Sequence, residues 1–213
     1  MLNIFRMVGD VSHLASIIIL IHQITVTRSI SGISFSTQSM YALVFATRYI
    51  DLIFRWVSLY NFLMKVFFIG SSVYILHLMK NKYRSSDNAK LDTFPWQYLI
   101  GGSAVAALIT TYSYSITEIL WAFSLWLESV AILPQLDILQ RTGEAQGITT
   151  HYIFALGLYR AMYIPNWLYR YFTEGRVDWL SVVTGVIQTA LYSDFFYIYY
   201  TRVMRGLKFE LPV

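Results

Sequence analysis

The sequence has no cysteine, and only 13% of its 213 residues are charged. Without cysteine, the protein cannot have a disulfide scaffold, a cysteine-based metal site or a thiol nucleophile. The share of charged residues is about half that of ordinary soluble domains, whereas 56% of the residues are apolar or aromatic and the mean hydropathy is +0.51. This composition argues against a soluble enzyme and against a disordered segment. It favours a compact integral membrane protein.

Signatures of other function classes are also missing. The net charge of +4 is small and scattered, whereas a nucleic-acid-binding protein concentrates lysine and arginine on one face. The sequence contains no glycine-rich phosphate loop, no paired-histidine metal motif and no Gly-x-Ser-x-Gly elbow. The Gly-x-Gly-Asp pattern of an intramembrane protease is absent too. We therefore expect neither an enzyme, nor a metal or other cofactor, nor a nucleic-acid partner.

Long apolar runs are what the sequence does contain. A bilayer core about 30 Å thick needs roughly 20 mainly apolar residues per helix. We interpret seven stretches as transmembrane helices, namely 4–24, 36–55, 58–79, 97–113, 116–136, 149–171 and 179–201. The expected fold class is an all-α integral membrane protein, a single seven-helix domain over residues 1–213 with a short tail at 202–213.

The basic residues between these stretches predict the orientation. When the N-terminus is placed outside, the outer loops hold little beyond Arg176. The inner loops and the tail hold the other basic residues, which are Arg28, Lys80, Lys82, Arg84, Lys90, Arg141, Arg202, Arg205 and Lys208. Because positive charge marks the cytoplasmic side, we expect a lumenal N-terminus and a cytosolic C-terminus.

A weak internal repeat relates the two ends of the chain. Arg28 is followed by the segments 31–34 and 41–45, and Arg141 is followed by the similar segments 146–149 and 154–158. The first three and the last three helices therefore resemble parallel copies, with the fourth helix as a linker. Repeats of this kind build transporter folds with a substrate site between the halves.

Ionisable residues inside the expected helices are numerous, and their spacing is helical. Each costs roughly 2.5–3.5 kcal/mol at the centre of a membrane helix, so such residues usually mark a site or a pathway. Arg6, Asp10 and His13 share one face of the first helix. A polar stripe follows the sixth helix, formed by Tyr159, Tyr163, Asn166 and Arg170.

The expected orientation places five of these charges in the lumenal halves of four helices, namely Arg6, Arg48, Asp51, Glu118 and Arg170. Three arginines favour an anionic ligand, because a guanidinium binds carboxylate through a planar fork. Two acids with Trp121 favour a cationic group, by charge and by cation–π contact. A small peptide with several carboxylates and one amine fits this layout. His13, Glu128 and Tyr159 lie roughly 10 Å deeper, at about 1.5 Å per residue.

Some of these residues also allow simpler interpretations. Arg6 and Arg170 could extend to the membrane interface, and Asp10 could do no more than pair with Arg6. Arg160 and Asp194 share a cytosolic depth and suit an ion pair that joins the last two helices. Lys65 either extends to the interface or serves as a counter-ion, and the sequence does not decide between them.

Over its whole length, the sequence resembles the family of KDEL/HDEL receptors, the ER lumen protein retaining receptors. The resemblance rests on residues 3–6, 9–14, 32–34, 41–45, 47–52, 126–135 and 157–161. The Pro134-Gln135 pair is also similar to the wider PQ-loop and sugar-transporter superfamily. The 3+1+3 helix layout of that superfamily matches the repeat described above.

The resemblance implies a receptor that binds the C-terminal Lys/His-Asp-Glu-Leu signal of ER lumenal proteins in the Golgi and returns them to the ER in retrograde vesicles. It implies that Arg48 holds the terminal carboxylate, whereas Arg6 and Arg170 meet the acidic side chains. The Lys or His of the signal would be received by Asp51, Glu118 and Trp121. The same pocket would be lined by Tyr163, Asn166 and Trp167. His13, Glu128 and Tyr159 would form a proton-dependent lock, with a hydrogen bond between Glu128 and Tyr159.

The expected residues of the transport and vesicle-coat signal are Asp194 in the last helix and Arg205 and Lys208 in the tail. Relatives commonly have adjacent lysines there, whereas this tail has Arg205-Gly206-Leu207-Lys208. Position 36 is Ser where relatives often have Lys. The alternative function is a PQ-loop-type transporter of a small anionic solute, and the ion pair between Arg160 and Asp194 would close the cytosolic exit that such transport needs.

Overall fold

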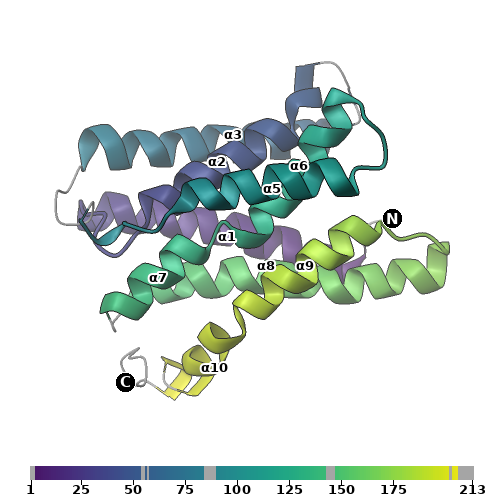
Figure 1. Ribbon diagram of the computed structural model, residues 1–213. Helices are drawn as coiled ribbons and strands as arrows, with labels where there is room; N and C mark the ends of the chain where they lie inside the picture. The colour runs from purple at the N-terminus through teal and green to yellow at the C-terminus, as the bar shows by residue number, and fades with distance from the viewer. Residues whose placement is uncertain are drawn as a thin grey trace. The chain divides into compact units, whose positions relative to one another are not determined.

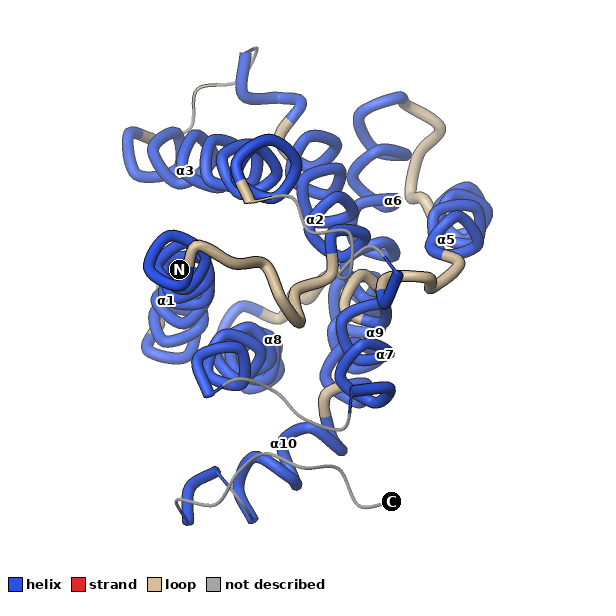
Figure 2. The backbone as a smooth tube through the Cα atoms, turned by 90° about the vertical axis from the view of Figure 1, so that its left-hand side faces the viewer, coloured by secondary structure: helices blue, strands red, loops and turns tan. Residues whose placement is uncertain are grey.

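The computed structural model describes residues 3–53, 56, 58–83, 90–142, 147–201 and 203–205. Throughout these residues the regular structure is helical and contains no strand (Figures 1 and 2). Three helical stretches are long and apolar enough to cross a membrane, Ile4–Thr27, Leu59–Lys82 and Ile116–Thr142. Two shorter helices, Trp96–Thr110 and Trp179–Leu191, are also apolar. The expectation of an all-helical protein with the character of a membrane protein is therefore confirmed, whereas the number of seven spans stays a prediction.

The chain divides into two compact units, Met1–Ile33 with Asp137–Val213, and Ser34–Leu136. The first unit contains α1 (Ile4–Thr27), α8 (Gly147–Glu174), α9 (Trp179–Leu191), α10 (Ser193–Thr201) and η3 (Val203–Arg205). The second contains α2 (Phe35–Arg48), η1 (Ile50–Ile53), α3 (Leu59–His77), η2 (Leu78–Lys82), α5 (Trp96–Thr110) and α6 (Ile116–Val130). Helix α7 (Leu133–Thr142) begins in the second unit and ends in the first. Each unit thus combines helices from both expected copies of the repeat, and the repeat itself stays a prediction.

In the first unit, α1 and α8 pack side by side in opposite directions (Figure 1). Their polar contacts fix the register, because Asn3 donates to Asn166 near one end and Gln23 donates to Thr149 near the other. Gly9 permits the close approach. A Cβ there would lie 2.9 Å from a ring carbon of Tyr163, closer than a real Cβ approaches another heavy atom.

In the second unit, α2 packs against α3 and α6, and α5 packs against α6. The start of α2 is held firmly. Ser34 caps it by accepting from the Thr37 amide, and Asp92 accepts from both the Ser34 hydroxyl and the Ser36 amide. The Gln135 side chain accepts from the Ser34 amide, so the Pro134-Gln135 segment anchors the first turn of α2. This anchoring places the other end of α2, and with it Arg48, in a defined position.

Three expected helices are shortened or interrupted in the structure. The stretch 36–55 forms an α-helix only from Phe35 to Arg48, followed by the short η1. The stretch 116–136 is interrupted after Val130 and resumes as α7, because Pro134 has no N–H and its ring would clash with the carbonyl of Val130. The stretch 179–201 is interrupted at Tyr192, a fully buried residue that packs against Gly157.

Candidate ligand-binding site

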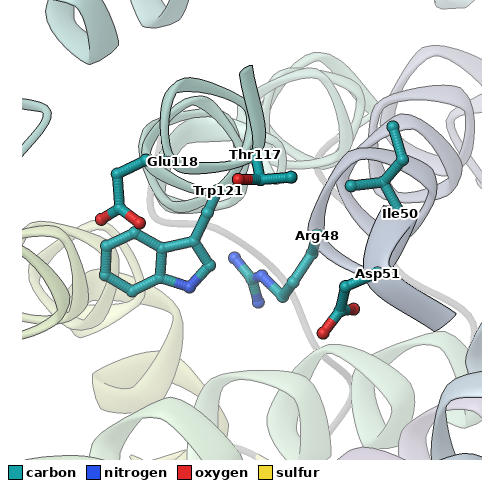
Figure 3. A pocket seen from close by; sticks show the side chains of 6 residues that line it. All are labelled: Arg48, Ile50, Asp51, Thr117, Glu118 and Trp121. Atoms are coloured by element: carbon teal, nitrogen blue, oxygen red, sulfur yellow. The ribbon is translucent and has the colours of Figure 1, made fainter. Parts of the chain in front are cut away.

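A polar pocket of about 510 Å³ opens in the second unit. It is lined by Arg48, Ile50, Asp51, Thr117, Glu118 and Trp121 (Figure 3). In this view the guanidinium of Arg48 lies between the Trp121 indole and the Asp51 carboxylate, with Glu118 beyond the indole. Four residues that the sequence analysis assigned to the ligand, Arg48, Asp51, Glu118 and Trp121, therefore surround one cavity. They come from the end of α2, from η1 and from the first turns of α6.

Arg48 is held in place by two residues of α6. Its Nε donates to the Ser124 hydroxyl at 3.0 Å and one terminal nitrogen donates to the Ser124 carbonyl at 3.1 Å. The other terminal nitrogen forms an ion pair with Glu128, whose side chain is 1% exposed. Two of these contacts are hydrogen bonds, so Ser124 takes two of the five N–H donors of the guanidinium. The guanidinium also lines the pocket, where its planar fork suits the two oxygens of a carboxylate.

Asp51 is paired with a lysine. The Lys65 ammonium on α3 lies 2.7 Å from Asp51 Oδ1, and its side chain is 11% exposed. The same ammonium lies 5.7 Å from the centre of the Tyr49 ring, a distance at which a cation–π contact is favourable. The structure thus answers the question that the sequence left open, because Lys65 is a counter-ion.

Glu118 and Trp121 form the opposite wall of the pocket. Ser115 caps α6 by accepting from the Glu118 amide, which places Glu118 in the first turn, where a negative charge is favoured. Within the part of the chain that the structure describes, the Glu118 carboxylate forms no ion pair. An acid next to an indole face is an arrangement that holds an alkylammonium or an imidazolium.

In the first unit, the expected polar stripe of α8 faces α1. The Tyr163 hydroxyl donates to Asp10 at 2.6 Å, and Asp10 also lies 3.7 Å from Arg6. Asn166 accepts from Asn3, the residue that caps α1. Asp10 therefore does more than pair with Arg6, since it also binds Tyr163.

Further along the same pair of helices, the His13 ring stacks on Tyr159 with ring centres 4.2 Å apart and an angle of 8° between the planes. Both side chains are buried. The Tyr159 hydroxyl has no hydrogen-bond partner among the described residues. Trp167 is buried against Gly185 of α9, and the buried Arg160 guanidinium lies near the rings of Tyr159 and Trp167.

The remaining predicted residues lie near the helix ends. Arg170 donates to Glu174 one turn further along α8, with 41% of its side chain exposed. Asp194 is exposed in the first turn of α10, and Arg205 is exposed at the end of η3. Lys208 lies outside the described residues. The ion pair between Arg160 and Asp194 stays a prediction.

The sequence analysis missed the residues that support the site. Ser124 holds Arg48, Asn3 holds Asn166, and Thr117 lines the pocket beside Glu118. Thr117 could have been predicted from the sequence, because it precedes Glu118 at the expected helix start. Ser124 lies one turn after Trp121, but no feature of the sequence alone indicates that it faces α2.

The described residues include no group of three or more histidine or acidic side chains that could hold a metal ion. The pocket residues themselves offer a guanidinium, two carboxylates and an indole. These groups can bind an anionic and a cationic group at separate places.

Comparison with known proteins identifies the class of protein that carries this site. The model of the ER lumen protein retaining receptor family matches residues 29–170. The chain is 58% identical to the ER lumen protein-retaining receptor of Kluyveromyces lactis over the full length of both, and 55% identical to that of Saccharomyces cerevisiae over 99% of this chain and all of the relative. It is 49% identical to the human ER lumen protein-retaining receptor 2, again over 99% of this chain and all of the relative.

Its apolar helices and these relatives define a multi-pass membrane protein of the ER and Golgi. The chain belongs to the ER lumen protein retaining receptor family, which confirms the resemblance inferred from the sequence. The members of this family are retrieval receptors and not enzymes.

Proposed function

We propose that this receptor binds ER lumenal proteins in the Golgi by a C-terminal signal, Lys/His-Asp-Glu-Leu, and returns them to the ER in retrograde vesicles. The observation that carries the proposal is the pocket, which the Arg48 guanidinium lines together with Glu118 and Trp121. A peptide end offers a carboxylate, and the Lys or His of the signal offers a cation, so one ligand supplies both groups that the pocket can bind.

In this proposal Arg48 holds the terminal carboxylate. Its position is fixed before the ligand arrives, because Ser124 and Glu128 already orient the guanidinium, and pre-ordering lowers the entropy cost of binding. Glu118, Trp121 and Asp51 form the place for the Lys or His of the signal.

Arg6 and Arg170 are our candidates for the acidic side chains of the signal. Each is about 40% exposed in its side chain and paired with an acid one helical turn away. Pairs of this kind along one helix are weak, and the arginine of each is accessible, so a ligand carboxylate can compete with Asp10 or Glu174 for the guanidinium. Tyr163, Asn166 and Trp167 complete this part of the proposed site.

We assign the proton switch to His13, Tyr159 and Glu128. Imidazole titrates near pH 6.5 in ordinary surroundings, between the neutral ER and the more acidic Golgi. An anionic peptide favours the imidazolium form of His13 over the neutral form. By linkage, affinity is then full in acid and falls as the pH rises through the imidazole range. The ligand is bound in the Golgi and released in the ER.

The direct test is a titration of the purified full chain with peptides that end in Lys-Asp-Glu-Leu and His-Asp-Glu-Leu, at acid and at neutral pH. A peptide with the same four residues in another order is the control. We expect tight binding of both signal peptides in acid, weaker binding at neutral pH and no binding of the control. Equal binding of all three peptides would contradict a signal receptor, and uptake of small anions into vesicles without peptide binding would point to the transporter.

A further inference from the structure

The charges around the pocket are balanced in pairs, with one exception. Arg48 is paired with Glu128, and Asp51 is paired with Lys65. Glu118 is the pocket acid that has no ionic partner within the described residues. The charged lining residues and their ionic partners carry two positive charges, on Arg48 and Lys65. They carry three negative charges, on Asp51, Glu118 and Glu128. The lining with these partners therefore has a net charge of −1.

Lys65 compensates the charge of Asp51, although Lys65 does not line the pocket itself. It reaches Asp51 from α3, where its side chain is 11% exposed, whereas 35% of the Asp51 side chain is exposed. Burial of an ammonium is costly unless an opposite charge compensates it. The contact of 2.7 Å between Lys65 Nζ and Asp51 Oδ1 supplies that compensation, and the Tyr49 ring adds to it.

We infer that Lys65 determines the specificity of the pocket by neutralising Asp51, so that the pocket accepts one cationic group and Glu118, with Trp121, holds it. This inference rests on the proposed function and revises the equal roles that the sequence analysis gave to Asp51 and Glu118. Asp51 shapes the wall of the pocket and keeps its ion pair when the ligand is bound. Glu118 alone provides the charge that attracts the Lys or His of the signal.

The consequence is a measurable change in selectivity. The relevant quantity is the ratio of affinities for two peptides that end in Lys-Asp-Glu-Leu and Ala-Asp-Glu-Leu. Lys65→Met leaves Asp51 with an uncompensated charge, so the ratio should rise by at least roughly tenfold, the effect of one more charge within about 10 Å at a protein surface. Asp51→Asn leaves Lys65 uncompensated, so the ratio should fall by a similar factor.

The double variant Asp51→Asn with Lys65→Met removes both charges and should restore the wild-type ratio. This outcome separates the inference from its main rival. If Asp51 itself held the ligand cation, the double variant would keep a ratio far below that of the wild type. Lys80→Met is the matched control, because Lys80 is an exposed lysine of η2 outside the pocket, and its ratio should equal that of the wild type.

The experiment measures dissociation constants of both peptides by titration of the purified full chain at acid pH. A higher ratio in Lys65→Met and a restored ratio in the double variant support the inference. An unchanged or lower ratio in Lys65→Met, or a low ratio in the double variant, overturns it. If Lys65→Met does not fold, the double variant still decides. If the wild type binds neither peptide, the proposed function fails instead.

Discussion

At the scale of single residues, the proposed site depends on the shape of the Arg48 side chain as much as on its charge. An ammonium is a point charge and cannot make the forked contact of a guanidinium. Arg48→Lys should therefore weaken binding of the signal peptide by about 1.5–3 kcal/mol, the usual value of a hydrogen bond to a charged group. Peptide titration at acid pH measures the loss. Arg176→Lys, at an exposed position, is the control, and equal losses at both positions would mean that the arginines act only through their charge.

His13 is the residue that should give binding its pH dependence. His13→Phe keeps a ring that can stack on Tyr159 but has no proton to gain. Because an anionic ligand favours the charged imidazole, affinity in the wild type should be highest in acid and fall as the pH rises toward neutrality. His13→Phe should lose the acid-enhanced affinity and show a flat profile, and His13→Ala should do the same. A normal acid dependence in both variants would place the sensor elsewhere, with Glu128 as the next candidate.

The charged residues of the pocket were predictable from the sequence, because charges inside apolar stretches are conspicuous. The residues that hold these charged side chains in place were not predictable. The sequence does not distinguish Ser124 from other helix residues, because its role arises only where α2 packs against α6 and places Arg48 next to it. In the same way, the pairing of Lys65 with Asp51 depends on where η1 ends and how α3 follows it.

At the scale of elements, the close pair of α1 and α8 positions the stripe that contains Tyr163 and Tyr159. A Cβ at Gly9 would lie 2.9 Å from the Tyr163 ring and 3.2 Å from the Tyr159 carbonyl. Gly9→Ala should therefore destabilise the protein by about 1–3 kcal/mol through overpacking and weaken peptide binding at acid pH.

Thermal unfolding of the purified protein measures the first effect of Gly9→Ala, and peptide titration measures the second. The matched control is Gly70→Ala in α3, where a Cβ would meet nothing within 4 Å. This substitution should leave binding unchanged. Equal effects of the two substitutions would mean that the α1–α8 contact does not position the stripe.

The helices themselves were predictable from apolar length, but their interruptions were not. Pro134 follows the end of α6, whereas α8 continues through Pro165 without a break. Both prolines remove one backbone hydrogen bond, so a proline alone does not determine whether a helix is interrupted. The interruption at Tyr192 has no proline or glycine at all.

At the scale of the whole molecule, the sequence supported two conclusions that comparison confirmed. Low charge with long apolar runs indicated a membrane protein, and extended strings of residues indicated the family. The grouping of α1 with α8 and of α2 with α6 could not be read in the same way. It depends on contacts between residues far apart in the chain, about which helical periodicity says nothing.

The orientation in the membrane is a prediction at this scale. Because the basic residues gather in the expected inner loops and tail, the C-terminus should be cytosolic. A tag after residue 213 should be digested by protease added outside sealed Golgi vesicles, whereas a tag before residue 1 should be protected. The reverse pattern would place the pocket on the wrong side for lumenal cargo.

The central claim is that Arg48 and its pocket bind the free end of a peptide, and blocking that end tests it most directly. The measurement compares a peptide ending in Lys-Asp-Glu-Leu with the same peptide as a C-terminal amide, titrated against the wild-type chain at acid pH. The amide removes the charge that the Arg48 guanidinium receives. We predict a loss of about 3 kcal/mol, or roughly 100-fold in affinity. Equal affinity of the amide and the free acid would contradict the account.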